Sequence, residues 1–189
     1  TTLSGNVAFG LHLRGYKVVL VDSDPQQTTL TWNNIRSGDN NELPFNAIAT
    51  SANSLKQLTE RMITKDGYDY VVIDGEAGIE QINRRVMEKV THLLLVTDAS
   101  KKGCQVVQTI KKVADELVMY DRIGVIANRI PDMEVAKLMD IGDLELLSVI
   151  QSDSKLAQAD VLGENVFNLP DDAIIVEGAK KALVNMGIL

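Results

Sequence analysis

The sequence is poor in cysteine and proline, and it has no long apolar run. Its single cysteine, Cys104, cannot form a disulfide within the chain, so we expect a reducing compartment, the cytoplasm. The apolar runs fall far short of the roughly 20 residues that a membrane-spanning helix needs. The first residues do not resemble a signal peptide. We therefore expect a soluble protein that has no membrane partner.

Positive charge and aromatic residues are also scarce. The chain has 19 Lys and Arg against 26 Asp and Glu, a formal net charge of −7. A broad basic surface for tight nucleic-acid binding is therefore not expected, and any DNA contact must be local. Hydrophobic residues make up 45% of the chain, which is enough for one ordinary core and excludes disorder. Because only 4% are aromatic, that core must rest on Val, Ile, Leu and Ala, as in buried parallel strands.

Short apolar runs of strand length recur along the chain. They cover residues 17–22, 45–50, 69–74, 92–97, 122–128 and 145–150. Between them, segments such as 55–62 and 106–117 space apolar residues three and four positions apart, which is typical of amphipathic helices. This alternation predicts an α/β fold in one domain over residues 1–189, with a doubly wound, mostly parallel sheet and helices on both faces. Ligands bind such sheets beyond the carboxyl ends of the strands.

The chain opens with a predicted helix and not with a strand. Leu3, Val7 and Leu11 have helical spacing, and Gly15 is expected to follow the end of a helix over residues 1–14. A helix that begins TTLSGN at this place resembles the helix that follows a phosphate-binding loop. We therefore expect that the first strand and the phosphate loop are absent from this sequence, so that the domain is N-terminally incomplete.

Two of the predicted strands end in acidic residues. Asp22 and Asp24 follow one strand in VDSDPQQ, and Asp74 ends another in VVIDGEAG. Carboxylates from neighbouring strands gather at one sheet edge, where a cation must balance their charge, and Mg²⁺ is the hard, oxygen-seeking candidate. A metal-bound phosphate substrate would follow. The alternative is that these residues only cap the loops and helices after them, since Asp is favoured there.

The run from Asp74 to Gly78 is a further indication of phosphate chemistry. Asp74 can hold a magnesium-bound water, and the Gly78 amide can approach a terminal phosphate because glycine has no side chain. A D-x-x-x-G match is weak by itself. Its position directly after an apolar strand makes it more specific.

Together these motifs resemble the ParA/MinD family of P-loop ATPases, which carry a deviant phosphate loop of the form KGGxGKTT. The opening run resembles the segment after that loop's lysine, and VDSDPQQ resembles the family's D-x-D-P-Q segment. Further similar segments are YDYVVIDGEAG, HLLLVTDAS, VIANRI and VLGENVFNL, so the resemblance spans essentially all 189 residues. It implies that ATP and Mg²⁺ are the cofactors.

The resemblance also implies roles for individual residues. Thr1 stands where a hydroxyl coordinates magnesium, and Thr2 where a hydroxyl or amide reaches the α-phosphate. Asp74 matches the ligand that binds magnesium through a water. Gly78 matches the glycine that senses the γ-phosphate.

Three more residues complete the implied site. Asp24 stands where the family orients or activates the attacking water, which makes it the catalytic candidate, and Asp22 stands beside the magnesium. Asn128 matches the asparagine that reads the adenine edge. The two lysines of the family's loop have no counterpart in this sequence, so this chain alone is expected to bind ATP poorly.

The implied function is a Mg²⁺-dependent ATPase that acts as a nucleotide-controlled dimerisation switch in plasmid or chromosome partitioning or cargo positioning. Its expected partners are a second copy, in a homodimer, and a protein that stimulates hydrolysis by ordering residues 24–31 and 75–80. Nonspecific DNA is a further expected contact of the partition branch. Lys155, Lys180 and Lys181 are the local basic residues for it, unless they are only solvated helix faces.

Two alternatives stay open. The EAGIE string also resembles CooC-type ATPases, which help to load nickel into carbon monoxide dehydrogenase, although Cys104 offers no cysteine pair for a metal. The second alternative is a non-hydrolytic dimerisation module with this fold. Asp24, Asp74 and Asn128 argue against it together, because a scaffold does not require carboxylates at strand ends.

Overall fold

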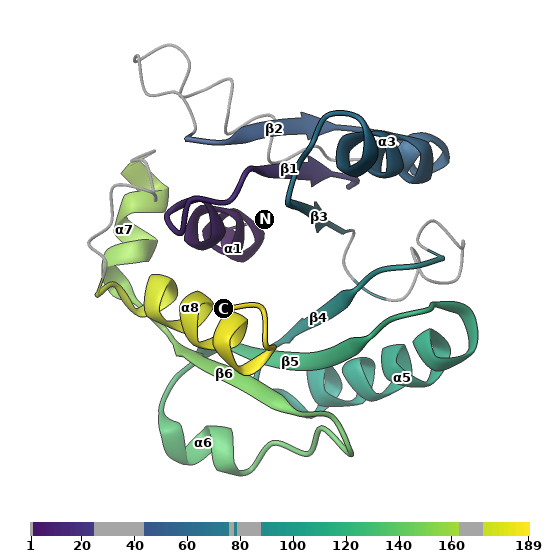
Figure 1. Cartoon of the computed structure of the whole chain (residues 1–189). Helices are drawn as coiled ribbons and strands as arrows, with labels where there is room; N and C mark the ends of the chain where they lie inside the picture. Colours follow the sequence, from purple (N-terminus) through teal and green to yellow (C-terminus); the bar gives the residue numbers. More distant parts are fainter. Residues whose placement is uncertain (1, 25–43, 76–77, 79–87, 163–171) are drawn as a thin grey trace. The chain divides into compact units, whose positions relative to one another are not determined.

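The computed structural model describes residues 2–24, 44–75, 78, 88–162 and 172–189. Contacts divide the chain into two compact units. The first comprises Thr1–Ala77 and Ala159–Leu169, and the second comprises Gly78–Gln158 and Pro170–Leu189. Each unit contains its own three-stranded parallel sheet (Figure 1).

The first unit is built around its central strand, β1. Its strands are β1 (Val18–Asp22), β2 (Asn46–Ala49) and β3 (Tyr70–Asp74), and its helices are α1 (Thr2–His12) and α3 (Ala52–Thr64). β1 pairs parallel with β2 on one side and with β3 on the other, so all three strands end at the same sheet edge. Every residue of β1 is buried, which explains why its VVLVD sequence is almost continuously apolar.

Helices α1 and α3 both pack on this sheet. α1 contacts β1 and β3 and buries Leu3, Val7 and Leu11, at the helical spacing that the sequence predicts. Gly15 follows the end of this helix with a φ of 86°. α3 contacts β3 and buries Leu55. The packing of α1 and α3 therefore supports the sheet and its strand ends.

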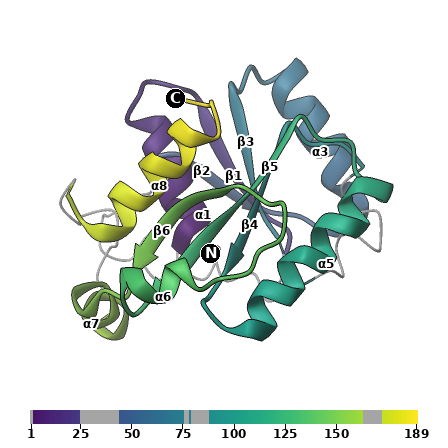
Figure 2. The ribbon, with the colours of Figure 1, turned by 90° about the horizontal axis from the view of Figure 1, so that it is seen from below.

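The second unit is built around strand β5. Its strands are β4 (His92–Thr97), β5 (Arg122–Ile130) and β6 (Leu146–Gln151), and its helices are α5 (Lys101–Leu117), α6 (Met133–Lys137) and α8 (Ile174–Asn185). Helix α7 (Ser154–Leu162) runs across the division between the units. The parallel strands have the order β4-β5-β6. Figure 1 and Figure 2 show α5 and α8 on opposite faces of this sheet.

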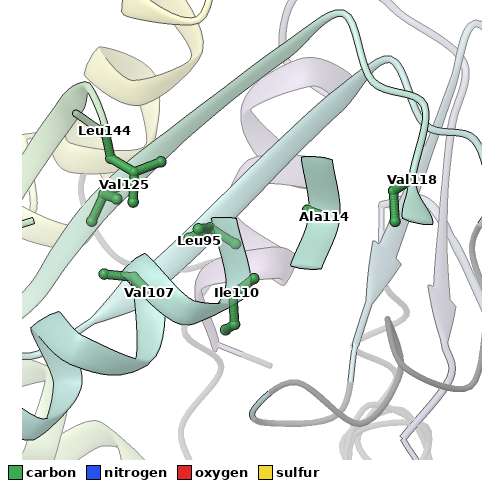
Figure 3. Packing of buried hydrophobic residues seen from close by; sticks show 7 residues of the cluster. All are labelled: Leu95, Val107, Ile110, Ala114, Val118, Val125 and Leu144. Atoms are coloured by element: carbon green, nitrogen blue, oxygen red, sulfur yellow. The ribbon is translucent and has the colours of Figure 1, made fainter. Parts of the chain in front are cut away.

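A core of aliphatic side chains joins α5 to the second sheet (Figure 3). Its buried members are Leu95, Val107, Ile110, Ala114, Val118, Val125 and Leu144. The α5 members recur three and four positions apart, so the periodicity of the sequence reports the packed face of this helix.

The predicted fold class is confirmed, because parallel sheets carry flanking helices. Apart from β5, each observed strand begins and ends within one residue of its predicted bounds. β5 runs to Ile130, two residues further than expected, and α1 ends at His12, before the predicted Arg14. The expectation of one domain over residues 1–189 stays a prediction. None of the helices in the described ranges combines the length and hydropathy that crossing a membrane requires.

Candidate functional site

The acidic ends of β1 and β3 lie side by side. Asp22 and Asp74 are register partners in the parallel pair, at the last residue of each strand. Asp22 is fully buried and Asp74 keeps 8% of its surface exposed. Burial of two neighbouring carboxylates is costly unless hydrogen-bond donors or positive charge balance them. The expectation that these residues share one sheet edge is confirmed, and their chemical roles stay predictions.

The turn after β1 ties the two strand ends together. The backbone N–H and the hydroxyl of Ser23 both donate to the Asp74 carbonyl oxygen, at 3.0 and 2.9 Å. The N–H of Asp24 donates to Asp22 Oδ1 at 3.0 Å, and the N–H of Thr50 donates to the Asp22 carbonyl oxygen at 3.0 Å. Half-buried Asp24 is therefore held next to the Asp22 carboxylate.

Sequence reasoning missed Ser23. This residue is 6% exposed, and its hydroxyl makes the second of the two bonds to β3. The signal in the sequence is a short hydroxyl residue between two aspartates, directly after a buried strand. Such a residue can bond to nearby backbone and so fix the turn.

The first turns of α1 contain a buried amide. Asn6 is 3% exposed, and its Nδ2 donates to the Thr2 carbonyl oxygen at 2.8 Å. Its Oδ1 is buried and has no hydrogen-bond partner within the described residues. A buried oxygen without a donor costs about 1–3 kcal/mol. The bond from Asn6 Nδ2 fixes the backbone of half-buried Thr2. Thr1 lies outside the described residues.

Gly78 and Asn128 belong to the second unit. Gly78 is exposed and has a φ of 91°, a conformation that favours glycine, and the residues on both sides of it lie outside the described part of the chain. Asn128 is half-buried near the carboxyl end of β5, and its Oδ1 accepts a hydrogen bond from the N–H of Arg129 at 3.0 Å. The structure thus brings the three aspartates together within the first unit. The implied roles of Gly78 and Asn128 stay predictions.

The carboxyl end of β4 is followed by another acidic residue that sequence reasoning missed. Asp98 Oδ1 accepts from the hydroxyl of Ser100 at 2.6 Å and from its N–H at 3.0 Å, and these bonds hold the pKa of Asp98 below its ordinary value. The Ser100 hydroxyl in turn accepts from the N–H of Gly103 and caps α5. A Cβ at position 103 would lie 2.5 Å from Asp98 Oδ1 and from Thr97 Oγ1, so any residue other than glycine would have to displace these side chains. The geometry assigns Asp98 to the helix cap.

The first sheet offers oxygen ligands for a cation at the ends of β1 and β3. Within the described residues, no group of three or more His, Cys, Asp or Glu side chains is arranged so that it could hold a metal ion. Mg²⁺ usually keeps several waters and binds only one or two carboxylates, unlike ions that need a full protein cage. Asp74, which keeps 8% of its surface exposed, is therefore the carboxylate that a hydrated Mg²⁺ could meet, with the fully buried Asp22 beside it in register.

Comparison with known proteins decides the family. Residues 1–166 match the model of the CobQ/CobB/MinD/ParA nucleotide-binding domain. The chain belongs to this family. An uncharacterized ATP-binding protein of Methanocaldococcus jannaschii is 36% identical over 126 residues, which cover 64% of this chain and 48% of that protein. The chain thus spans about half the length of this relative.

Solved structures share the fold of this CobQ/CobB/MinD/ParA domain. The MinD cell division protein of Aquifex aeolicus gives a TM-score of 0.74 at 20% identity, over 99% of this chain and 91% of that one. MinD of Pyrococcus horikoshii complexed with Mg-ADP gives 0.64 at 18% identity, over 96% and 87%. A plasmid partition protein of Borrelia burgdorferi gives 0.62 at 14% identity, over 100% and 93%. At these identities the likeness shows the fold alone.

Proposed function

We propose that this protein is a Mg²⁺-dependent ATPase that uses ATP to control a homodimer, in plasmid or chromosome partitioning or in the positioning of other cargo. The observation that carries the proposal is the register of Asp22 with Asp74, two buried carboxylates at the ends of adjacent parallel strands. Membership in a nucleotide-binding family supports it, and so does the Mg-ADP complex of a MinD with the same fold.

The metal would be held at the end of the first sheet. Asp74 would bind it through a water, Asp22 would lie beside it, and the hydroxyl of Thr1 would be a direct ligand. When bound, Mg²⁺ neutralises charge on the phosphates during phosphoryl transfer. The hydrogen bonds of Ser23 to the Asp74 carbonyl oxygen keep the two carboxylate-bearing strand ends in position.

Asp24 is the proposed catalytic residue. It would orient the attacking water, because the N–H of Asp24 is bound to Asp22 Oδ1 and the turn therefore holds Asp24 close to the proposed metal site. Phosphoryl transfer requires little covalent chemistry from the protein, so placing the water is the main task of such a residue. Thr2 would reach the α-phosphate, Gly78 would sense the γ-phosphate, and Asn128 would read the base.

The proposed partners are a second copy, a protein that stimulates hydrolysis, and DNA bound nonspecifically. The segments expected to respond to that protein, residues 24–31 and 75–80, are described only in part. For DNA, Lys155 and Lys181 are exposed, and Lys180 forms an ion pair with Glu177 at 3.2 Å. Any DNA contact through these residues would therefore be weak and sensitive to salt.

No described contact favours the nickel-loading alternative. Cys104, its one cysteine candidate, is buried in α5, and burial raises the pKa of the thiol. A buried thiol with a raised pKa is a poor metal ligand, because the thiolate is the binding form. That alternative is therefore not proposed.

The decisive experiment compares Asp24→Ala with Asp69→Asn in full-length protein. Asp69 is an exposed acid at the opposite end of β3 and serves as the control, with Asn chosen because its amide oxygen can still accept from the N–H of Lys17, as the carboxylate does at 2.8 Å. We expect the wild type to release phosphate from ATP only with Mg²⁺. Asp24→Ala should keep its ATP affinity and lose hydrolysis by about 100-fold or more, and Asp69→Asn should match the wild type. Unchanged turnover in Asp24→Ala would remove this residue from the catalytic role, and ATP binding without any wild-type turnover would favour the non-hydrolytic module.

A further inference from the structure

The carboxyl end of β5 contains one residue more than the strand beside it. Ala127 pairs with Val149 of β6, and the next pair joins Ile130 to Gln151. The chain thus takes three steps along β5 for two along β6. This is a β-bulge, and Asn128 lies inside it.

Packing on both sides of the bulge holds it in place. Ala127 and Ile130 are fully buried and belong to one apolar cluster with Ala136 of α6. Residues three apart on a regular strand point to opposite faces, so only the extra residue allows both side chains into the same cluster. The Ile130 carbonyl oxygen also accepts a hydrogen bond from the N–H of Ser152 at 2.9 Å, which fixes the far side of the bulge.

Arg129 takes up the backbone strain of this arrangement. Its φ is 57°, and no other non-glycine residue in the described ranges has a positive φ. Glycine is the usual residue in this conformation, because a side chain disfavours it. Such strain persists only where the surroundings over-determine it, and it is concentrated at functional sites. Arg129 is exposed, so packing of its own side chain does not explain the conformation.

The strained residue fixes the amide of its neighbour. The N–H of Arg129 donates to Asn128 Oδ1 at 3.0 Å. This bond defines which end of the amide is oxygen and which is nitrogen. No described residue accepts a hydrogen bond from Asn128 Nδ2, so its donors remain for a ligand. The oxygen keeps a second lone pair that can accept a further bond.

We infer that Arg129 is a positioning residue that sets base selectivity through its main chain, by locking the Asn128 amide in the orientation that selects a 6-aminopurine over a 6-oxopurine. The inference rests on the proposed function, in which Asn128 reads the base. A 6-aminopurine presents a donor, its amino group, beside the acceptor N7, and an amide held in one orientation matches both. A 6-oxopurine presents two acceptors. An amide that rotates freely could donate a hydrogen bond from its NH₂ to the 6-oxo group. The hydrogen bond from the Arg129 N–H to Asn128 Oδ1 prevents that rotation.

The test separates the main chain of Arg129 from its guanidinium. Arg129→Gly and Arg129→Val both delete the guanidinium, but glycine accepts a positive φ whereas β-branched valine resists it. Binding of ATP and of inosine triphosphate, which carries a 6-oxo base, is measured by calorimetry on the full-length proteins. We expect the wild type and Arg129→Gly to prefer ATP by about tenfold or more, and Arg129→Val to prefer it by less than about threefold.

A second measurement needs no nucleotide. The side-chain NH₂ resonances of Asn128, assigned by their loss in Asn128→Asp, should stay unchanged in Arg129→Gly. In Arg129→Val they should shift to the position of a freely rotating amide. This readout also shows that each variant is folded, because the remaining amide signals should keep their dispersion.

Several outcomes would overturn the inference. Equal loss of selectivity in both variants would assign the effect to the guanidinium, and unchanged selectivity in Arg129→Val would show that the bulge plays no part. A wild type that binds both nucleotides equally would also refute it while leaving an ATPase in place. A wild type that binds neither nucleotide would refute the proposed function first, and the selectivity with it.

Discussion

The two sheets in the described part of the chain end differently at their carboxyl edges. In the first, β1 and β3 stay in unbroken register to their last residues, and the register itself sets Asp22 beside Asp74. In the second, the register of β5 with β6 shifts between Val125 and Ile126 and again between Ala127 and Ile130. The second shift is the bulge, with a strained Arg129, that carries Asn128. A regular ladder thus positions the acidic pair, and a packed irregularity positions the amide. The two ends should therefore respond differently to substitution.

The largest expected effect on stability comes from the residue that packs beneath the bulge. Ile130→Ala removes a fully buried side chain next to Ala127 and should lower the free energy of unfolding by about 2–5 kcal/mol. The variant should also release the bulge, so the N–H of Arg129 should exchange with solvent faster than the global loss of stability explains. Chemical denaturation and hydrogen exchange followed by NMR measure the two effects.

A control in the first sheet sharpens this contrast. Val21→Ala shortens an equally buried side chain in the middle of the regular strand β1. It should lower stability without any local change at Arg129. The contrary result is that Ile130→Ala lowers stability and the exchange rate of the Arg129 N–H rises only as much as the lower stability explains. The bulge would then not depend on this packing, and the contrast between the two sheet ends would be wrong.

The same contrast explains how far the sequence could be read. The strands were predictable because buried parallel strands are almost continuously apolar, and Asp22 and Asp74 were predictable because each follows such a run directly. The bulge was not, because VIANRI reads as an ordinary strand end and a positive φ at Arg129 has no glycine to announce it. The register of β5 with β6 and the burial of Ile130 in the same cluster as Ala127 reveal it, and both depend on contacts between segments that are distant in the chain.

Ser23 shows a smaller gap of the same kind. Its neighbours Asp22 and Asp24 drew attention as chemical groups, whereas the hydroxyl between them joins β1 to β3. The bond depends on the pairing of two strands about fifty positions apart in the chain, which no local pattern contains. Asp98 differs from Ser23. In the sequence it follows an apolar strand, as Asp74 does, but in the structure it accepts hydrogen bonds from Ser100 and belongs to the cap of α5.

An intermediate effect is expected where the hydroxyl joins the two acidic strands. Ser23→Ala removes one hydrogen bond to the Asp74 carbonyl oxygen and leaves the backbone N–H bond in place. Unfolding free energy should therefore fall by about 0.5–1.5 kcal/mol. Ser54→Ala, at an exposed site in the same unit, should change it by less than about 0.5 kcal/mol. A loss in Ser23→Ala no larger than that of the control would show that the regular ladder alone holds the strand ends.

The smallest effect concerns the acid after β4 and is visible only in the pH dependence of stability. The hydrogen bonds from Ser100 lower the pKa of Asp98 in the folded state, so the ionised form favours folding. This contribution is present above the pKa of the unfolded chain and is lost as the pH falls through the lower folded pKa, that is, below about pH 4. Asp98→Asn has no such ionisation, and Ser100→Ala lacks the hydroxyl that is the main cause of the shift. The free energy of unfolding, measured by denaturation between about pH 6 and 3, should therefore fall more steeply with decreasing pH in the wild type than in either variant. If the free energy of unfolding fell equally with pH in all three proteins, the charge of Asp98 would not stabilise the helix cap. The presence of an acidic residue after β4, as at the end of β3, would then need another explanation.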